Sequence, residues 1–464
     1  MFERVAIRFS AWAERWLPDA FVFALLATVI VFAAGLTVGH ASPVELTESW
    51  GKGFWDLTSF TMQMALVIVT GYVLASSRPI ARVIERLARL PRTARGATVL
   101  LALFSLAASW INWGFSLVFG ALLAREMARL RPEADYRALA ASSFLGLGSV
   151  WAQGLSSSAA LLMASAGTMQ PRLRDIVSAG GVVPGGVIPL RSTLFTWQSA
   201  TAVAIETAIV AGVVAAYTPV GPRARTAAAL GVTIGPLVVD EPETTQPTPG
   251  ERLERSSVLG LAVFALGAAY LALRFARAPD RLGALDLGTI NLGFLMLGVL
   301  LHGTPARLMH AVRAAVPATW GVILQFPFYA GIAGMITYTG LNARIAHVFV
   351  SASTHESFPP LVAAYSVVLG IFVPSAGAKW LIEAPYVMQA SHDLHCNLAW
   401  TVDVYNLGEA LANLVQPFWM LPTLAILGLR ARDVMGFTLV VFVVLAPVVL
   451  VMVTLLGATL PYPL

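Results

Sequence analysis

The chain has 464 residues, of which 57% are hydrophobic and only 12% are charged, about half the charged fraction of an average soluble domain. Its mean hydropathy is +0.75, and repeated apolar runs of about 20 residues indicate membrane spans rather than the cores of a soluble protein. The single cysteine excludes a disulfide framework, and the net charge of +5 does not indicate nucleic-acid binding, because the arginines lie in short segments between the apolar runs.

The first half of the chain alternates apolar segments with short amphipathic ones. Residues 1–16 are amphipathic, and we find no small-residue cleavage pattern of a signal peptide after them. Apolar composition predicts membrane spans at 20–38, 61–76 and 194–217. Tryptophan and arginine anchors predict interfacial helices at 44–60 and 79–90.

Two polar interruptions occur within this half. The apolar segment 97–111 leads into a polar, glycine-containing run at 109–116, after which the chain returns through the membrane at 112–124. A second interruption, at 152–158, divides the segment 136–166. Polar, non-helical backbone is tolerated at membrane depth only where protein or a water-filled cavity supplies hydrogen-bond partners. Both interruptions therefore predict breaks that line a cavity.

The stretch 219–257 is the least hydrophobic part of the chain. It contains a run at 239–250 that is rich in Pro, Thr and Glu and cannot bury a core. We therefore expect a cytoplasmic linker at 219–257 between a first repeat, 1–218, and a second unit, 258–464.

The second unit repeats the order of features of the first. Apolar composition predicts spans at 258–273, 287–301, 320–338 and 435–460, and interfacial helices at 304–319 and 342–353. The segment 358–372 enters the membrane and meets a polar, glycine-containing run, which predicts a hairpin at about 373–391 to match one at about 110–126. The segment 399–427 is expected to break near 406–413 and again near 416–422, to match the broken helix at about 138–167.

Corresponding features of the two halves lie about 260 residues apart: Gln63 corresponds to Gln325, and Asn112 to Ser375. With a cytoplasmic N-terminus, most of the 30 Lys and Arg residues fall on the cytoplasmic side, and the extra span 258–273 inverts the second half. Matched breaks in two halves point to the binding site of a secondary transporter. The predicted fold is an all-α polytopic membrane protein of two inverted repeats, each with a re-entrant helical hairpin and a broken transmembrane helix.

The hairpin tips are the first candidate substrate site. Asn112, Trp113 and Gly114 lie at the first tip, and Ser375 and Gly377 at the second. Unwound backbone at such tips leaves N–H and C=O groups free, and helix N-termini favour anions. The tips are therefore predicted to bind a substrate carboxylate or a coupling cation, although the same residues would also serve to close a buried turn.

Three consecutive hydroxyl residues, Ser156, Ser157 and Ser158, form a second candidate. They follow Gln153 and Gly154 at the break of the segment 136–166, so they are predicted to contact substrate. Small residues of this kind also serve close helix packing, which is the structural alternative.

Lys379 and Glu383 are charged residues within the second hairpin, four residues apart. Charges at membrane depth are costly and by default mark functional sites. Lys379 is predicted to attract an anionic substrate and to keep Glu383 ionised, and Glu383 could carry a proton. The alternative is a structural Lys–Glu pair one helical turn apart.

Glu409 and Asn413 share one face of the broken segment 399–427. Because Glu409 has no basic neighbour in the sequence, we expect it to be the coupling residue that binds a proton or Na⁺, with Asn413 and Glu383 as further cation-coupling candidates. Hydrogen bonding between helices is the alternative role.

Other chemistry finds little support. The run from His392 to Cys396 has metal-binding residue types but lies in a short loop, so no metal site and no cofactor beyond a coupling Na⁺ or H⁺ is expected. We find no P-loop, zinc-protease motif or nucleophile elbow. A membrane-embedded enzyme that acts on lipid-linked acyl groups remains the alternative of a different class, and its mark would be a nucleophile with a nearby base.

Several sequence blocks resemble the bacterial short-chain fatty acid transporter family. These blocks are SWINWGFS at 109–116, QFPFYAGI at 325–332, VPSAG at 373–377 and QPFWMLP at 416–422, with WLPD at 16–19 and RDVMG at 432–436. The resemblance runs nearly end to end and implies uptake of small monocarboxylates such as acetoacetate or butyrate across the bacterial inner membrane.

The family is similar, more distantly, to the wider ion transporter superfamily. That similarity implies a scaffold domain, a transport domain that moves in an elevator-like way, and a homodimer. The paired-tip site of the superfamily carries over to Asn112 and Ser375, while the second tip departs from the pattern in having fewer glycines and in carrying Lys379 and Glu383. The same fold with another small anion, a dicarboxylate or an amino acid, as its substrate is the nearest alternative.

Overall fold

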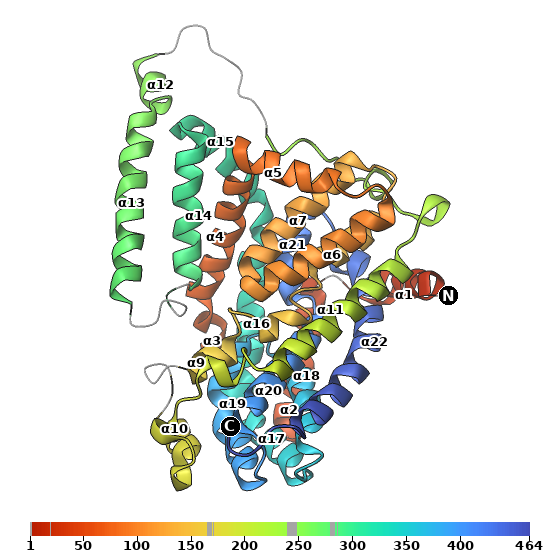
Figure 1. Ribbon diagram of the computed structural model, residues 1–464, viewed down its shortest axis with the longest axis vertical. Coiled ribbons are helices and arrows are strands. Elements are labelled where there is room, and N and C mark those ends of the chain that lie inside the picture. Colours follow the sequence, from red (N-terminus) through yellow and green to blue (C-terminus); the bar gives the residue numbers. More distant parts are fainter. Residues whose placement is uncertain are drawn as a thin grey trace.

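The computed structural model describes residues 2–18, 20–164, 169, 171–238, 248–278, 284 and 286–464. All the regular secondary structure in these ranges is helical. The bundle is elongated, with α5 (Arg78–Arg89) and α15 (Pro305–Ala315) at one end and α10 (Pro171–Ser178) and α17 (Leu341–Ser351) at the other (Figure 1). The predicted topology requires this separation of the segments 79–90 and 342–353.

Seven helices of the described ranges are long and apolar enough to cross a membrane, and a bent pair makes an eighth candidate. The bent pair joins Leu398–Asn413 to Phe418–Leu427 at an angle of 69°. The seven are Ala20–Thr37, Pro43–Ala75, Ala94–Ile111, Trp197–Tyr217, Ser257–Arg277, Trp320–Tyr338 and Ala431–Gly457. The protein is thus an all-helical, multi-span membrane protein, as predicted.

The first half begins with an amphipathic helix and ends at the low-hydropathy stretch. Its α-helices are α1 (Phe2–Trp16), α2 (Ala20–Thr37), α3 (Pro43–Asp56), α4 (Thr58–Ala75), α5, α6 (Ala94–Ile111), α7 (Trp113–Leu130), α8 (Tyr136–Phe144), α9 (Ser158–Met163), α10 and α11 (Trp197–Tyr217). Short 3₁₀ turns are η1 (Val150–Gln153), η2 (Ala179–Gly181), η3 (Pro184–Gly186), η4 (Leu190–Ser192), η5 (Gly221–Arg223) and η6 (Ala228–Leu230).

The second half follows a short surface helix, α12 (Pro249–Glu254). Its helices are α13 (Ser257–Arg277), α14 (Leu287–His302), α15, η7 (Val316–Ala318), α16 (Trp320–Tyr338), α17, α18 (Phe358–Phe372), α19 (Ala376–Asp393), α20 (Leu398–Asn413), η8 (Phe418–Met420), α21 (Leu421–Leu427) and α22 (Ala431–Gly457). Helix α13 stands beside α14 at one edge of the bundle, and none of its residues is buried (Figure 1).

Polar side chains fix where many of these helices begin. The Ser42 hydroxyl accepts the N–H of Glu45 at the start of α3, and Asn397 accepts the N–H of Trp400 at the start of α20. Such caps satisfy backbone donors that have no partner within the helix. The apolar stretches between these caps then pack as spans.

The sequence predicts an interfacial helix at 44–60. In the structure α3 continues almost directly into α4, and Pro43–Ala75 together is one 33-residue candidate span. Helix α3 crosses α16 closely, with Gly53 against Gly334 and Trp50 against Gly331. Small residues at such a crossing let two backbones approach closely. The interfacial position of 44–60 stays a prediction.

A charged network ties the N-terminal helix to the body of the protein. Arg137 at the start of α8 donates to Asp135 at 2.8 Å and to Glu14 of α1 at 3.0 Å, and Arg225 donates to Glu14 at 2.7 Å. Arg137 and Asp135 are buried, so the network that holds α1 against the bundle is not merely an exposed ion pair.

The predicted linker at 219–257 contains η5, η6 and α12. Its Pro/Thr/Glu-rich centre, 239–247, lies outside the described residues, as do residues 165–167 of the broken helix predicted at 138–167.

Candidate functional site

The first tip is a turn of one residue. Helix α6 ends at Ile111, Asn112 has an extended backbone, and α7 begins at Trp113. The Asn112 side-chain oxygen accepts the N–H of Phe115 at 2.9 Å, so it caps α7. This is the turn-closing role that the sequence left open as an alternative.

The first tip is hydrogen-bonded to the first break. The Trp113 N–H donates to the Ser156 hydroxyl at 3.1 Å, and the Leu155 N–H donates to the Trp110 carbonyl at 2.7 Å. A side chain on Gly154 would lie 2.3 Å from the Trp110 oxygen, so only glycine allows this approach. The chain from η1 to α9 and the tip of α6 and α7 therefore form one packed unit.

The three serines of the break reach three different elements. Ser156 contacts the first tip, and Ser157 accepts a hydrogen bond from Asn406 of α20 at 2.6 Å. Ser158 faces Gly377 of the second tip, where a side chain on that glycine would lie 3.7 Å from the Ser158 Cβ. The serine run thus lies between the two tips and brings them together indirectly.

The break expected at 406–413 is a correction. Helix α20 runs without interruption to Asn413, and the bend falls at 414–417, at the start of the second break predicted near 416–422. Asn413 donates to the Leu147 carbonyl at 3.1 Å and accepts from Gln416, so its polar group is satisfied without unwinding. The helix ends where Pro417 can no longer donate a backbone hydrogen bond.

Lys379 has a different partner from the one predicted. Its ammonium forms an ion pair with Glu409 of α20, not with Glu383 one turn away on its own helix. It also donates to the Ser366 carbonyl at 3.0 Å and to the Ser366 hydroxyl at 3.2 Å, both on α18. The pair is possible because Gly370 of α18 leaves room: a side chain there would lie 2.7 Å from the Glu409 carboxylate. The premise that Glu409 lacks a basic neighbour is therefore wrong in three dimensions.

Glu383 is held by tyrosines. The Tyr405 hydroxyl of α20 donates to its carboxylate at 2.6 Å, and Tyr365 of α18 interacts with the same carboxylate. The Lys379 ammonium lies 4.9 Å from the centre of the Tyr405 ring, within range of a cation–π contact. The two acids, the lysine and the tyrosines therefore form one cluster, which we call the Lys379 cluster (Lys379, Glu383, Glu409, Ser366, Tyr365 and Tyr405).

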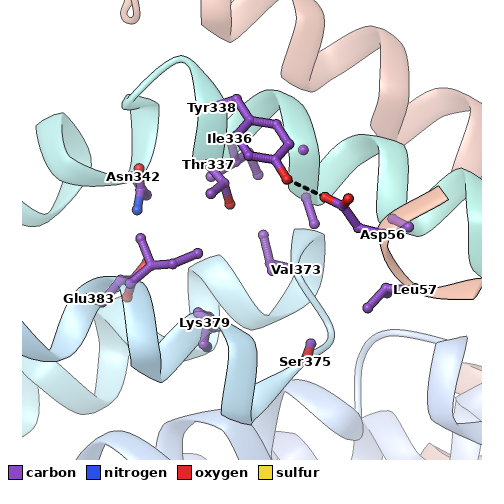
Figure 2. Close-up of a pocket in the computed structure, with 14 residues that line it drawn as sticks. Asp56, Leu57, Ile336, Thr337, Tyr338, Asn342, Val373, Ser375, Lys379 and Glu383 are labelled. Carbon is purple, nitrogen blue, oxygen red and sulfur yellow. Dashed lines mark hydrogen bonds between the residues drawn. The ribbon is translucent and has the colours of Figure 1, made fainter. Parts of the chain in front are cut away.

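A cavity of about 150 Å³ opens onto this cluster. It lies between α16, the start of α17, the junction of α3 and α4, and the second tip with α19, and Figure 2 shows Ser375, Lys379, Glu383 and Asn342 around it. At about 30 Å³ per liquid water, the space is enough for about five waters or one small organic anion. At its rim, Tyr338 donates a short hydrogen bond to Asp56 (Figure 2).

The structure thus divides the predicted site residues between two places. Ser375, Lys379, Glu383 and Glu409 gather at the cavity and in the Lys379 cluster. Gly377 of the second tip does not line the cavity and faces Ser158. The remaining predicted residues lie around the first tip and the first break, and none of them lines the cavity: Asn112, Trp113, Gly114, Ser156, Ser157, Ser158 and Asn413.

Sequence reasoning missed five members of these sites. Ser366, Tyr365 and Tyr405 belong to the Lys379 cluster, Asn342 lines the cavity, and Asn406 joins α20 to the serine run. The position of Tyr405, one turn before Glu409 on the same helix, was the available signal. Ser366 and Asn342 lie on other helices, and spacing along the sequence does not show which helices contact each other.

Comparisons with known proteins were made for the whole chain. Residues 1–456 match the family model described as short chain fatty acid transporter. Two curated relatives carry the name "Putative short-chain fatty acid transporter". The one from Escherichia coli K12 is 35% identical over 443 residues, covering 94% of this chain and 96% of the relative. The one from Haemophilus influenzae is 33% identical over 452 residues, covering 97% and 99%.

Two solved structures are similar over most of their lengths, with low scores. The YdaH transporter of Alcanivorax borkumensis is 16% identical with a TM-score of 0.44, over 95% of this chain and 98% of that chain. MtrF of Neisseria gonorrhoeae is 14% identical with a TM-score of 0.41, over 98% and 97%. The sequence matches, which span nearly the whole chain, show that this membrane protein belongs to the short-chain fatty acid transporter family.

Proposed function

We propose that this transporter imports short-chain monocarboxylates such as acetoacetate or butyrate, with Lys379 as the residue that binds the carboxylate. The observation that carries the proposal is a lysine only 2% exposed that lines a small cavity at a hairpin tip. A buried ammonium is a strong partner for a carboxylate, and the cavity suits a substrate with few carbon atoms. Family membership favours the same substrate class.

Uptake is coupled to a cation, H⁺ or Na⁺, in this proposal. Glu383 and Glu409 are buried acids beside Lys379, and both belong to the coupling machinery. Asn413 contributes by fixing the end of α20 to the link between α8 and η1, since its side chain donates to Leu147.

Access alternates by an elevator-like movement of the two hairpins and broken helices against a scaffold. The packing of the first tip and second tip on the serine run supports their movement as a unit. We further propose a homodimer in the bacterial inner membrane, with a cytoplasmic N-terminus and the first repeat at 1–218.

The direct test is counterflow of labelled butyrate and acetoacetate in proteoliposomes. Wild-type protein should accelerate exchange above protein-free vesicles, and Lys379→Gln should raise the apparent substrate constant or abolish exchange. Arg86→Gln, which removes an exposed charge at the opposite end of the bundle, is the matched control. No counterflow by folded wild-type protein, or counterflow only of amino acids or dicarboxylates, would reject the substrate class. Hydrolysis of an acyl substrate without gradient-dependent accumulation would favour the alternative of a membrane-embedded enzyme.

A further inference from the structure

The Lys379 cluster contains two carboxylates and one ammonium. Lys379 is 2% exposed, Glu383 is 1% exposed and Glu409 is fully buried. If all three groups were ionised, the cluster would carry one net negative charge at membrane depth. A buried charge without a partner costs several kcal/mol, so one of the two carboxyl groups must be neutral.

Geometry indicates which carboxyl group is neutral. Glu409 forms the ion pair with Lys379 and is therefore the ionised acid. Glu383 has no ion pair among the described residues and is held by the Tyr405 hydroxyl at 2.6 Å. The resting cluster is then neutral as a whole, with one proton on Glu383.

All three N–H donors of Lys379 are in use. One faces Glu409, one the Ser366 carbonyl and one the Ser366 hydroxyl. Ser366 is itself fixed, because its hydroxyl donates to the Tyr405 carbonyl at 2.6 Å. An incoming carboxylate can therefore gain a strong bond to Lys379 only by taking the place of Glu409.

We propose that substrate binding is an exchange: the substrate carboxylate replaces Glu409 on the Lys379 ammonium, and Glu409 takes up one proton. This inference rests on the proposed function, in which Lys379 binds the carboxylate. The ion pair between Lys379 and Glu409 breaks, and an ion pair between Lys379 and the substrate carboxylate takes its place. An O–H bond forms on the Glu409 carboxyl group, and its proton arrives with the substrate. The cluster is neutral before and after, so the site loads a carboxylate only together with a proton.

Other charged groups on the elements that pack against the Lys379 cluster do not change its net charge. Asp403 lies six residues before Glu409, about 9 Å along α20. Other described charges of neighbouring elements have partners elsewhere: Asp56 with Tyr338, Arg344 of α17 with the Val38 carbonyl, Arg174 of α10 with the Gly185 carbonyl, Asp393 of α19 with Gln389, and Asp433 of α22 with the Arg430 N–H. Two further titratable side chains, His347 of α17 and Asp175 of α10, are exposed.

The test is titration calorimetry of acetoacetate and butyrate into purified protein in nanodiscs, in two buffers of different ionisation enthalpy. Wild-type protein is expected to take up about one proton per carboxylate bound. Glu383→Gln and Glu409→Gln should each keep this value, because the remaining acid pairs with Lys379 and is displaced in turn. Absence of proton uptake by wild-type protein that binds the carboxylate, or loss of the uptake in either single variant, would overturn the exchange.

A second measurement does not depend on the variants folding. If one proton is taken up with the substrate, the dissociation constant of the wild type should rise about tenfold per pH unit across the range in which that proton is bound. A dissociation constant independent of pH would contradict the exchange while leaving carboxylate binding intact. Absence of any carboxylate binding by folded wild-type protein would instead reject the proposed function itself.

Discussion

The crossing of α3 and α16 offers a sharp test of the packing. A methyl group on Gly334 would lie 2.6 Å from the Gly53 Cα and 2.6 Å from the Ser49 carbonyl oxygen. Both neighbours are backbone atoms, which cannot rotate away as a side chain can. Gly334→Ala must therefore push the two helices apart.

The size of the effect follows from this distance. Non-bonded carbon atoms reach their optimum at about 3.5 to 4.0 Å, so the helices must separate by roughly 1 Å. Overpacking of this kind lowers the free energy of unfolding by about 1 to 3 kcal/mol, and the better helix propensity of alanine offsets up to about 1 kcal/mol of that loss. We expect a net loss of about 1 to 2 kcal/mol. Because Gly334 also lines the cavity, the separation should weaken carboxylate binding too.

Thermal unfolding in detergent, followed by tryptophan fluorescence, would measure the loss. The matched control is Gly321→Ala on the same helix, where the nearest atom to the new methyl group is a side-chain nitrogen 3.8 Å away. The control should unfold at or above the wild-type temperature, and Gly334→Ala clearly below it. Equal unfolding temperatures for the two variants would refute the close crossing.

Three further predictions use the same kind of reasoning. Arg137→Ala should lower the free energy of unfolding by about 3 to 5 kcal/mol, because it leaves the buried Asp135 carboxylate without its ion-pair partner, while Glu14 keeps Arg225. A shift in thermal unfolding no larger than that of an exposed arginine variant would contradict it. Ser157→Ala should cost about 1 kcal/mol through the bond from Asn406, with Ser157→Thr restoring it. Cys396 is 5% exposed, and burial raises the pKa of its thiol to about 11. Its reaction with maleimide at pH 7 should therefore be far slower in the native protein than after denaturation. Rapid labelling of the native protein would contradict this burial and show that the loop between α19 and α20 is open.

The spans and both tips could be predicted from the sequence. Asn112 and Ser375 interrupt apolar runs with polar residues, and such interruptions are visible without any tertiary information. Composition alone also identifies a membrane protein, because few charges separate long apolar segments.

The partner of Lys379 could not be predicted in the same way. Sequence spacing shows only neighbours on one helix, and so it indicated Glu383. The observed pair with Glu409 depends on how α18, α19 and α20 meet, and on the space that Gly370 leaves between them. Local patterns carry no information about such contacts between helices.

The end of α20 shows a related limit. Polar residues from Asn406 to Asn413 suggested unwinding, since polar groups at membrane depth need partners. In the structure their partners come from other elements, Ala152 and Leu147 among them, so the helix continues. A polar residue within an apolar segment therefore marks a contact, and only a residue such as Pro417 marks the break.

The backbone bonds between the first tip and the first break have a mechanical consequence. Because Leu155 and Trp113 donate across this junction, neither segment can shift without the other, and their amide protons should exchange with deuterium slowly and in step. Deformation during transport must then concentrate in connectors outside the junction. Gly303, Gly340 and Gly428, all with positive φ and each between two helices of the second half, are the joints at which such rotation meets least steric resistance.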